Sequence, residues 1–442
     1  MSQTAVSHYQ DQFRLLSGAA PSPSWIAELR LRAMNRFAEI GFPSTREEDW
    51  RFTNVESIAE GGFALGTTVG KGVSESDIAG LAGSGVDQGP RLVFADGIWS
   101  RSLSRLSGLP NGVRIEPFSA ALVSSPDLIQ KHLGYYAKYD TAGFTALSTA
   151  FLRDGALVHI GAGVEWDHPI QIVFAASGAE GIAVHPRCLV VVERGARAVV
   201  QELYVGPGGK YFTNAVTELV VAEGARLDHY RIQDDSRTAY HIASTHSHQG
   251  RDSVLDSCSI AFGSRMSRHE VAAVLDGSGA FLNLNGLSVL GGHQHVDHHT
   301  VIDHAQPHCE SHELFNGVFD EQARGVFNGR IVVRPGAQRT DSKQTNNNLL
   351  LSRDARADSQ PQLEIYADDV KCTHGATLGP LDDTSMFYLQ SRGIDAVQAR
   401  KLLTYGFGAD IVNRVQNLAV RKYLDRLLVD RLSHLPMGGI LS

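Results

Sequence analysis

The stretch "CLVVVERGARAVVQELYVG" (residues 188–206) contains the repeat from which the architecture follows, because two short valine-rich runs meet at a tight Gly-Ala turn. The pattern returns in "AVTELVVAEGARLDHYRIQ" (residues 215–233). The turn glycines Gly195 and Gly224 are 29 residues apart, and similar turns at Gly279 and Gly336 follow after 55 and 57 residues, close to twice that period. A fixed repeat of this size in strand-like sequence predicts a solenoid whose coils stack on one another.

Helical patterns flank the strand-rich part of the chain. "SPSWIAELRLRAMNRFAEIGFP" (residues 22–43) opens with serine and proline, as helix starts do, and residues 116–140 also have a helical pattern. Near the C-terminus, "GADIVNRVQNLAVRKYLDRLLVDRL" (residues 408–432) has one helical face, formed by Ile411, Val415, Leu418 and Ala419. The loop "TYGFG" (residues 404–408) is expected to join these last helices to the solenoid.

The expected fold is mainly β, with a central parallel β-helix between two α-helical regions. The predicted boundaries are an N-terminal helical or mixed region at 1–145, a β-helix core at 146–380 and a C-terminal helical domain at 381–442. Within the core, Asn346, Asn347 and Asn348 are expected to form a structural polar ladder between coils, where they satisfy backbone groups at corners.

The composition and the termini exclude several classes of protein. The net charge of -8 argues against a general nucleic-acid binder, and no apolar run approaches the ~20 residues of a membrane helix. The start "MSQTAVSHYQDQFRLL" lacks the apolar core and cleavage site of a secretory signal, which predicts a cytoplasmic protein. The four cysteines form no CxxC pair, and the phosphate-binding pattern GxxxxGK[ST] is absent, so the chain is not itself a P-loop ATPase.

A cysteine and a histidine stand two positions apart in "DDVKCTHGATLG" (residues 368–379). If this segment is extended, Cys372 and His374 share one face, and their side chains can reach a common metal ion or cluster edge. Thiolate and imidazole are suitable ligands for iron, but clusters normally have about four protein ligands. The missing ligands would come from a partner or a substrate, which suits a transient scaffold; the alternative is simple packing at the end of the solenoid.

A histidine-rich tract, "GGHQHVDHHTVIDHAQPHCESHELF" (residues 291–315), is the second conspicuous feature. Its histidines are His293, His295, His298, His299, His304, His308 and His312, and it also contains Cys309. Such a tract is typical of metal binding, but in a β-helix the same spacing favours a hydrogen-bonded histidine ladder near a dimer contact. The spacing lacks the helical His-Glu-x-x-His pattern of metalloproteases.

Three functions remain open from the residues alone. A β-helix carbohydrate-active enzyme would need clustered carboxylates, for which Asp297, Asp303 and Asp341 are the candidates. A standalone homodimeric metal-binding β-helix protein would use the histidine tract. The third reading is a scaffold subunit that acts in a complex and has no catalytic activity of its own.

Three long segments resemble one known family. "FNGRIVVRPGAQRTDSKQTNNNLLLS" (residues 327–352), "PQLEIYADDVKCTHGATLG" (361–379) and "MFYLQSRGIDAVQARKLLTYGF" (386–407) are similar to the SufB/SufD family of iron–sulfur cluster assembly proteins. The resemblance runs from about residue 145 to the end, and the wording "KCTHGAT" is closer to the D-type members (SufD). Before residue 145 the resemblance is looser, with "REEDWRF" (46–52) as its best fragment.

The resemblance implies a scaffold subunit of a SufBCD-type complex that builds and transfers nascent iron–sulfur clusters. Its partners would be a SufB-type scaffold chain, met through the ends of the β-helices, and a SufC-type ABC ATPase, bound through the C-terminal helices, with Tyr405, Gly406 and Phe407 as partner-binding candidates. A transient cluster would be shared with the partner at an interface that contains His374 and Cys372. The same resemblance leaves room for a flavin in the complex and for a homodimer.

Overall fold

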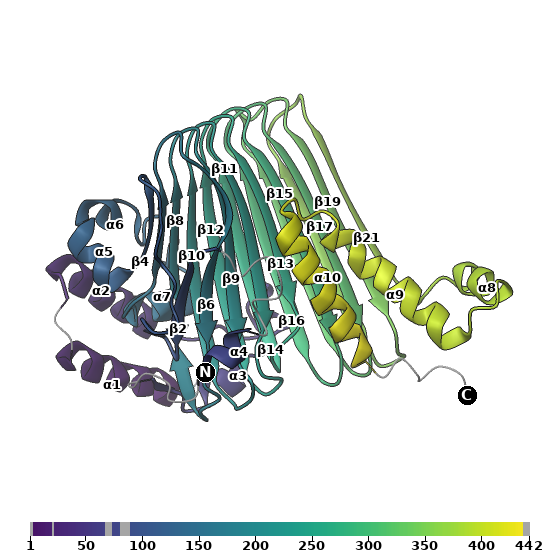
Figure 1. The fold of residues 1–442 in the computed structure, drawn as a ribbon, viewed down its shortest axis with the longest axis horizontal. Helices are drawn as coiled ribbons and strands as arrows, with labels where there is room; N and C mark the ends of the chain where they lie inside the picture. Colours follow the sequence, from purple (N-terminus) through teal and green to yellow (C-terminus); the bar gives the residue numbers. More distant parts are fainter. Residues whose placement is uncertain (1–2, 20–21, 67–72, 80–88, 436–442) are drawn as a thin grey trace.

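A computed structural model describes residues 3–19, 22–66, 73–79 and 89–435. Its centre is a parallel β-solenoid with two long sheets as its walls (Figure 1). Sheet A runs in the order β20-β18-β16-β14-β12-β10-β8-β5-β4, with β1 and β7 beside this path, and sheet B in the order β21-β19-β17-β15-β13-β11-β9-β6-β2-β3. The predicted fold class, a mainly β chain with a central β-helix and terminal helices, is confirmed.

The strands of sheet A are β1 (Ala64–Leu65), β4 (Val113–Pro117), β5 (Ala156–Ile160), β7 (Ile182–Val184), β8 (Arg187–Val192), β10 (Phe212–Val221), β12 (Tyr240–Gln249), β14 (Met266–Leu275), β16 (His295–His304), β18 (Arg324–Val333) and β20 (Arg356–Ile365). Those of sheet B are β2 (Arg91–Ala95), β3 (Ile98–Trp99), β6 (Glu165–Ala175), β9 (Arg197–Val205), β11 (Arg226–Asp234), β13 (Val254–Ala261), β15 (Phe281–Leu290), β17 (Glu310–Phe319), β19 (Asp341–Leu350) and β21 (Lys371–Gly379).

The glycine repeat corresponds to the turns between the two sheets. Gly195, Gly224 and Gly279 have φ angles of 64°, 64° and 75°, a left-handed conformation that glycine adopts without steric cost. Each turn leads from a strand of sheet A into the next strand of sheet B, and successive strands of each sheet pair in parallel register. The repeat inferred from the sequence is therefore the coil of the solenoid.

The interior of the solenoid combines an apolar core with buried polar ladders. Alternate side chains of each strand point inward, so residues such as Val190, Leu219 and Ile331 form one continuous cluster. The asparagine ladder is confirmed as a structural feature: Asn346 donates to the Phe315 carbonyl, and Asn347 donates to Asn316 one coil earlier. These asparagines lie within β19 rather than at a corner.

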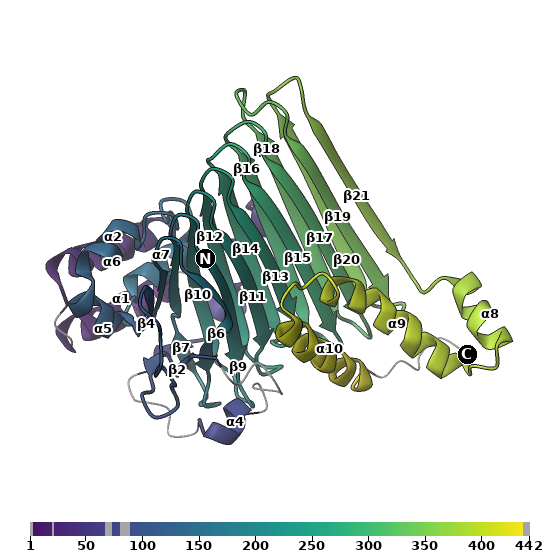
Figure 2. The same ribbon diagram turned by 45° about the horizontal axis from the view of Figure 1, so that its top comes forward.

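The N-terminal helices pack against the first coils, most of them on the outer face of sheet A, whereas α4 packs on sheet B through Ile78 (Figures 1 and 2). They are α1 (Gln3–Ala19), α2 (Ser24–Ile40), the 3₁₀ helix η1 (Glu48–Trp50), α3 (Glu56–Ala59), α4 (Glu75–Ala79), α5 (Phe118–Ser124), α6 (Pro126–His132) and α7 (Gly143–Ala150). The helical pattern expected at 116–140 is confirmed in part. That segment holds the end of β4 and two short helices, because Pro126 forces Ser125 out of the helical conformation (φ -150°, ψ 53°).

Three C-terminal helices follow the last coil, namely α8 (Asp383–Ser391), α9 (Ala396–Val412) and α10 (Leu418–Ser433). Helices α9 and α10 cover the outer face of sheet B, where Ile411 and Leu424 pack with outward-facing residues such as Ile260 and Val318. The predicted loop at 404–408 is wrong, because these residues lie inside α9. The predicted single face of Ile411, Val415 and Leu418 is also interrupted, since α9 ends at Val412 and α10 begins after its cap, Asn417.

None of the helices in the described part of the chain is long and apolar enough to span a membrane.

Candidate functional site

The last coil of the solenoid is open. Strand β21 pairs along one edge with β19, and β20 pairs with β18, and both strands end their sheets (Figure 2). Among the described residues no strand covers the outer edge of β21. An uncovered strand edge presents unpaired N–H and C=O groups to another chain, so this end of the molecule is suited to receive a partner.

Cys372 and His374 both lie on β21 at this open end, as the sequence analysis predicted. They are two residues apart in one strand, so their side chains leave the same face about 7 Å apart along the chain. In the register of the sheet, Cys372 stands over Ser342 and His374 over Gln344, whose side chains are both buried in the interior. The shared face is therefore the interior face of the solenoid, exposed because no further coil covers it.

The two side chains differ in accessibility. Cys372 is partly buried and packs against the core together with Leu363 and Val370, whereas His374 is exposed. Burial raises the pKa of the Cys372 thiol, and the nearby carboxylate of Asp341 raises it further. A thiol with a raised pKa is a poorer nucleophile and metal ligand at neutral pH, so the imidazole is the more available of the two groups.

A cavity of about 340 Å³ connects the C-terminal end of β21 with the terminal helices. It is lined by Thr377 and Leu378 of β21, by Ser385 of α8, and by Leu403 and Phe407 of α9. The strand that holds His374 and the helical arm are thus direct neighbours.

The three partner-binding candidates lie in α9 and face the body of the protein in part. The Tyr405 hydroxyl donates to Asp425 of α10 at 2.6 Å, and the Phe407 carbonyl accepts from Asn316 of β17. Both rings pack against the cluster beneath α9 and α10, and Gly406 is exposed between them. Their role in partner binding stays a prediction.

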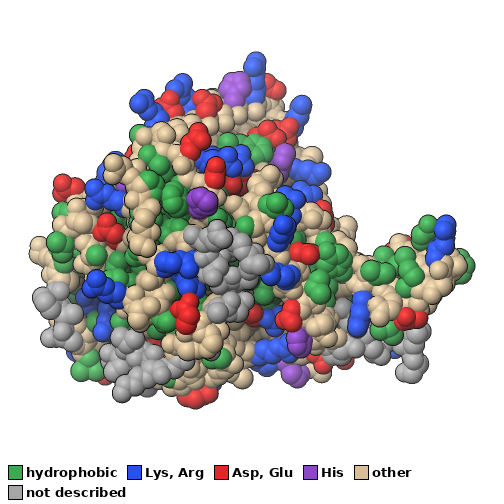
Figure 3. Space-filling model, in the orientation of Figure 1, with side chains coloured by type: hydrophobic (Ala, Val, Ile, Leu, Met, Phe, Trp, Pro, Cys, Tyr) green, Lys and Arg blue, Asp and Glu red, His purple; other side chains and the backbone are tan. Residues whose placement is uncertain are grey.

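Helix α8 offers the more accessible apolar surface. None of its residues is buried, and Phe387 and Tyr388 are 72% and 56% exposed. The helix projects from the end of the solenoid, and hydrophobic side chains are visible on this arm in the space-filling view (Figures 1 and 3). Two adjacent exposed aromatic side chains on a projecting helix are typical of an interaction surface.

The histidine tract is distributed over both faces of β16 and the start of β17 rather than gathered at one point. His298 and His304 point into the solenoid and bond to Ser288 and Ser311, whereas His295 and His299 point outward, toward Thr53 and Asp297. The hydrogen-bonded histidine arrangement is confirmed, and its place near a dimer contact stays a prediction. The described residues contain no group of three or more histidine, cysteine, aspartate or glutamate side chains arranged to hold a metal ion.

The carboxylates considered for a carbohydrate-active enzyme do not meet. Asp297 is buried against Arg268, and Asp303 pairs with Arg334, both on the outer face of β16 in sheet A. Asp341 begins β19 in the other sheet. The arrangement offers no paired carboxylates for general acid and base catalysis.

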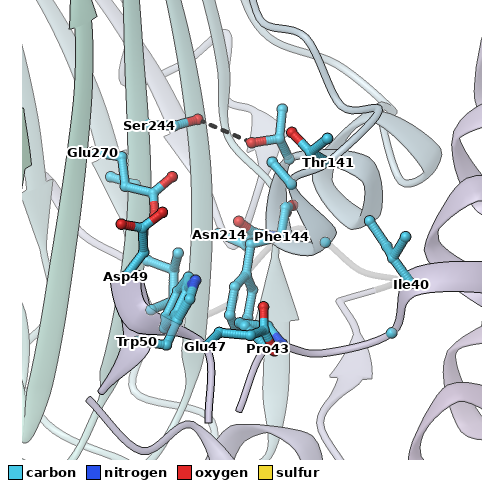
Figure 4. Close-up of a pocket in the computed structure, with 16 residues that line it drawn as sticks. Ile40, Pro43, Glu47, Asp49, Trp50, Thr141, Phe144, Asn214, Ser244 and Glu270 are labelled. Atoms are coloured by element: carbon cyan, nitrogen blue, oxygen red, sulfur yellow. Dashed lines mark hydrogen bonds between the residues drawn. The ribbon is translucent and has the colours of Figure 1, made fainter. Parts of the chain in front are cut away.

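A cavity of about 200 Å³ between the N-terminal region and sheet A lies apart from β21 (Figure 4). Asp49, Trp50 and Phe144 line it from the N-terminal side, and Glu270 from β14. The Glu270 carboxylate accepts two hydrogen bonds from Arg268, which also donates to the Asp49 carbonyl. These contacts join the N-terminal region to the solenoid, and none of the predicted site residues takes part.

Two family models match the chain. The model of the SufBD core domain of the SUF system for iron–sulfur cluster assembly matches residues 174–407, and that of the SufBD protein N-terminal region matches residues 1–172. The chain belongs to the SufBD family. The first match spans most of the solenoid, the open end and the first part of α9, so the candidate site lies within the family's core domain.

Curated relatives agree with this assignment. The SufBD chain is 31% identical over 402 residues to an iron–sulfur cluster assembly SufBD family protein of Synechocystis, with 89% of this chain and 88% of the relative covered. It is 29% identical to the iron–sulfur cluster assembly protein SufD of Escherichia coli, covering 90% and 91% of the two chains. The SufD protein of Bacillus subtilis is 26% identical, with 95% and 97% covered. The predicted family is confirmed, and it links the SufBD chain to iron–sulfur cluster assembly.

Sequence reasoning missed two groups of residues at this end of the SufBD chain. The exposed pair Phe387 and Tyr388 was visible only as two adjacent aromatic letters in "MFYLQ", without an apolar period to mark a buried face. Gln344, directly under His374, lies in the alternating polar run "DSKQTNNN", for which the sequence predicts only the structural ladder of its three asparagines.

Proposed function

We propose that this chain is the D-type scaffold subunit of a SufBCD-type complex that builds nascent iron–sulfur clusters and passes them on. The cluster is the cargo of the complex, and the subunit itself is not an enzyme. The observation that carries the proposal is the exposed imidazole of His374 on the uncovered edge strand β21. An imidazole is a suitable iron ligand, and its position leaves the remaining ligands to another chain.

The open coil is the proposed contact with a SufB-type scaffold chain. A partner strand can add to the free edge of β21 and bury the face that presents His374 and Cys372. The cluster would then form between the two chains, with His374 as a ligand and the partly buried Cys372 in a supporting role. Such shared ligation explains why this chain supplies only part of a ligand set.

The projecting helix α8 and the start of α9 are the proposed contact with a SufC-type ATPase. Phe387, Tyr388 and Val397 are exposed there, next to the cavity that leads to β21. Nucleotide-driven movement of two ATPase subunits would displace these helices, and the displacement would pass along β21 to the interface with His374. Binding of a flavin by the complex and a cytoplasmic location stay predictions.

The test is co-expression of the chain with its SufB-type and SufC-type partners, followed by size-exclusion chromatography. A stable complex of all three chains supports the proposal. A chain that elutes as a homodimer without binding either partner contradicts it, and supports instead the alternative of a standalone β-helix protein. Iron bound stoichiometrically by that homodimer would point to metal binding.

A further inference from the structure

A row of polar side chains continues inward from His374. The strand register places His374 beside Gln344 of β19, and Gln344 beside Glu313 of β17. Gln344 and Glu313 are 1% and 2% exposed. Since neighbouring strands lie about 4.8 Å apart, the three side chains form a column along the solenoid axis that ends at the open coil.

The orientation of the Gln344 amide is set by the inner member of this column. Gln344 Nε2 donates a 2.6 Å hydrogen bond to Glu313 Oε2. A side-chain amide donates only through its nitrogen and accepts only through its oxygen. With the nitrogen turned toward the carboxylate, Gln344 Oε1 is left as the free end, and it is buried without a hydrogen-bond partner among the described residues.

A glycine in the opposite sheet holds the amide in place. A Cβ atom added at Gly329 of β18 would lie 2.3 Å from Gln344 Nε2 and 2.8 Å from its Cδ. The amide therefore packs directly against the backbone at Gly329 and has no room to move toward sheet A. Its position is determined by the carboxylate on one side and by this close approach on another.

The neighbouring ladders of β19 lack such a free acceptor. Ser342, under Cys372, bonds to Ser311, which bonds in turn to His304. Asn346 donates to a backbone carbonyl, and its oxygen accepts from Asn348. Of the inward-facing side chains of β19, only Gln344 has a buried oxygen without a partner in the described structure. A buried acceptor without a partner loses the hydrogen bonds it would make in water, so a donor is expected at that point.

We propose that Gln344 is a positioning residue for His374, whose ring N–H donates to Gln344 Oε1. This bond would fix the tautomer of the His374 ring. The other ring nitrogen would then be unprotonated, with its lone pair free to bind iron. Histidines that ligate metals generally donate their second ring nitrogen to such an acceptor, which orients the ring. The inference rests on the proposed role of His374, and it adds Gln344, Glu313 and Gly329 as the groups that orient the imidazole.

The test is nuclear magnetic resonance of the full chain labelled with ¹⁵N-histidine, with the His374 signals assigned by their loss in His374→Asn. Burial raises the pKa of Glu313 to about 7, so spectra recorded at pH 8.5 observe the ionised carboxylate. The wild type is expected to show one dominant His374 tautomer, and Gln344→Leu a mixture of both. Gly329→Ala, which displaces the amide without removing it, is expected to shift the same signals.

The matched control is Lys343→Gln, on the adjacent, outward-facing position of β19, which should leave the His374 signals unchanged. Identical His374 spectra in the wild type and in Gln344→Leu would overturn the inference. Because tautomers are measured without any cluster, this result is independent of whether His374 acts in assembly.

A complementation assay separates the two claims. If His374→Ala supports growth as well as the wild type does, the proposed role of His374 in cluster assembly is contradicted. This conclusion does not depend on the tautomer observed by nuclear magnetic resonance. If His374→Ala fails to complement, Gln344→Leu is expected to lower assembly about 10- to 100-fold in a complex that still forms. Full activity of Gln344→Leu in that case would overturn the positioning role.

Discussion

Cys372 and His374 share one face of β21, yet the thiol packs against the core of the solenoid and the imidazole is exposed at its open end. The difference follows from their places in the last coil. Cys372 packs against the core cluster near the turn into β21, as Leu363 and Val370 do, whereas no coil lies above His374 in the described structure. The pair is therefore unequal, and its two members should respond differently to substitution.

We expect Cys372→Ala to retain most of the cluster-assembly activity and to lower the free energy of unfolding by about 1 kcal/mol, because it removes a partly buried sulfur from the core. Complementation and chemical denaturation measure the two effects. Loss of activity as complete as that of His374→Ala, in a folded protein, would show that the thiol is a necessary ligand.

Phe387→Ser combined with Tyr388→Ser should weaken binding of the ATPase subunit by about 30-fold or more, because exposed aromatic side chains on a projecting helix are typical binding hot spots. Thermal stability should not change, since no residue of α8 is buried. The control is Val123→Ser on α5, a similarly exposed apolar residue at the other end of the molecule. Unchanged ATPase affinity, measured by isothermal titration calorimetry, would exclude α8 as the contact.

These point substitutions are a sharper test than truncation. Helices α9 and α10 supply Ile411, Leu424 and Leu428 to the cluster that covers sheet B. Deleting them would expose that sheet and unfold part of the solenoid, so lost binding would have two explanations.

Glu218→Gln is expected to destabilise the fold strongly. The Glu218 carboxylate accepts a 2.6 Å bond from Arg187, and both side chains are fully buried. Burial raises the pKa of Glu218, but Arg187 and backbone amides outweigh it, so the carboxyl is ionised in the fold. Breaking a buried ion pair on one side typically costs about 3–5 kcal/mol, because the other charge remains buried without a partner.

Urea denaturation of Glu218→Gln should show this loss, and the control is Glu223→Gln, which removes an exposed partner of Arg251. Exposed ion pairs contribute little to stability, so the control should unfold at the same urea concentration as the wild type. Equal midpoints for both variants would contradict the assigned importance of the buried pair.

Stability should fall as the pH is lowered from 6.5 toward 4. Burial lowers the pKa of His298 and His304 to about 4 and that of His185 to about 3. Because the pKa of histidine in the unfolded chain is about 6.5, only the unfolded state gains these protons in this window, which costs roughly 3 kcal/mol per group at most. Glu313 has the opposite effect on stability. Its pKa is raised to about 7, so as the pH falls the folded state binds a proton that the unfolded chain binds only near pH 4.5.

The three histidines outnumber this one carboxyl, so the denaturation midpoint should decrease across the window, and less steeply in His298→Asn. A midpoint that is constant or rises between pH 6.5 and 4 would contradict the assignment of neutral, buried histidines.

The sequence predicted the solenoid because its period is local and repetitive. Gly195 and Gly224 each mark a turn that needs a positive φ, and the strands between them are rich in β-branched residues. The Cys372–His374 pair could be placed on one face for the same reason, since alternation in a strand depends only on spacing.

Tertiary packing explains what the sequence did not reveal. The glycines in "TYGFG" suggested a loop, but they lie in α9, where a Cβ on Gly408 would approach Leu428 of α10 to 3.0 Å. Glycine there permits close contact between two helices, which outweighs its low helix propensity. Gln344 and Glu313 are 31 residues apart in sequence and become neighbours only through the register of the coils.

The most direct test of the account is complementation by His374→Ala in a strain whose iron–sulfur cluster assembly depends on this pathway, with the complex purified from the same cells. We predict loss of growth while the three-chain complex is recovered intact, because the substitution removes an exposed ligand and no buried contact. Normal growth with His374→Ala would contradict the central claim, and would leave the open end of the solenoid as a binding surface without a part in cluster chemistry.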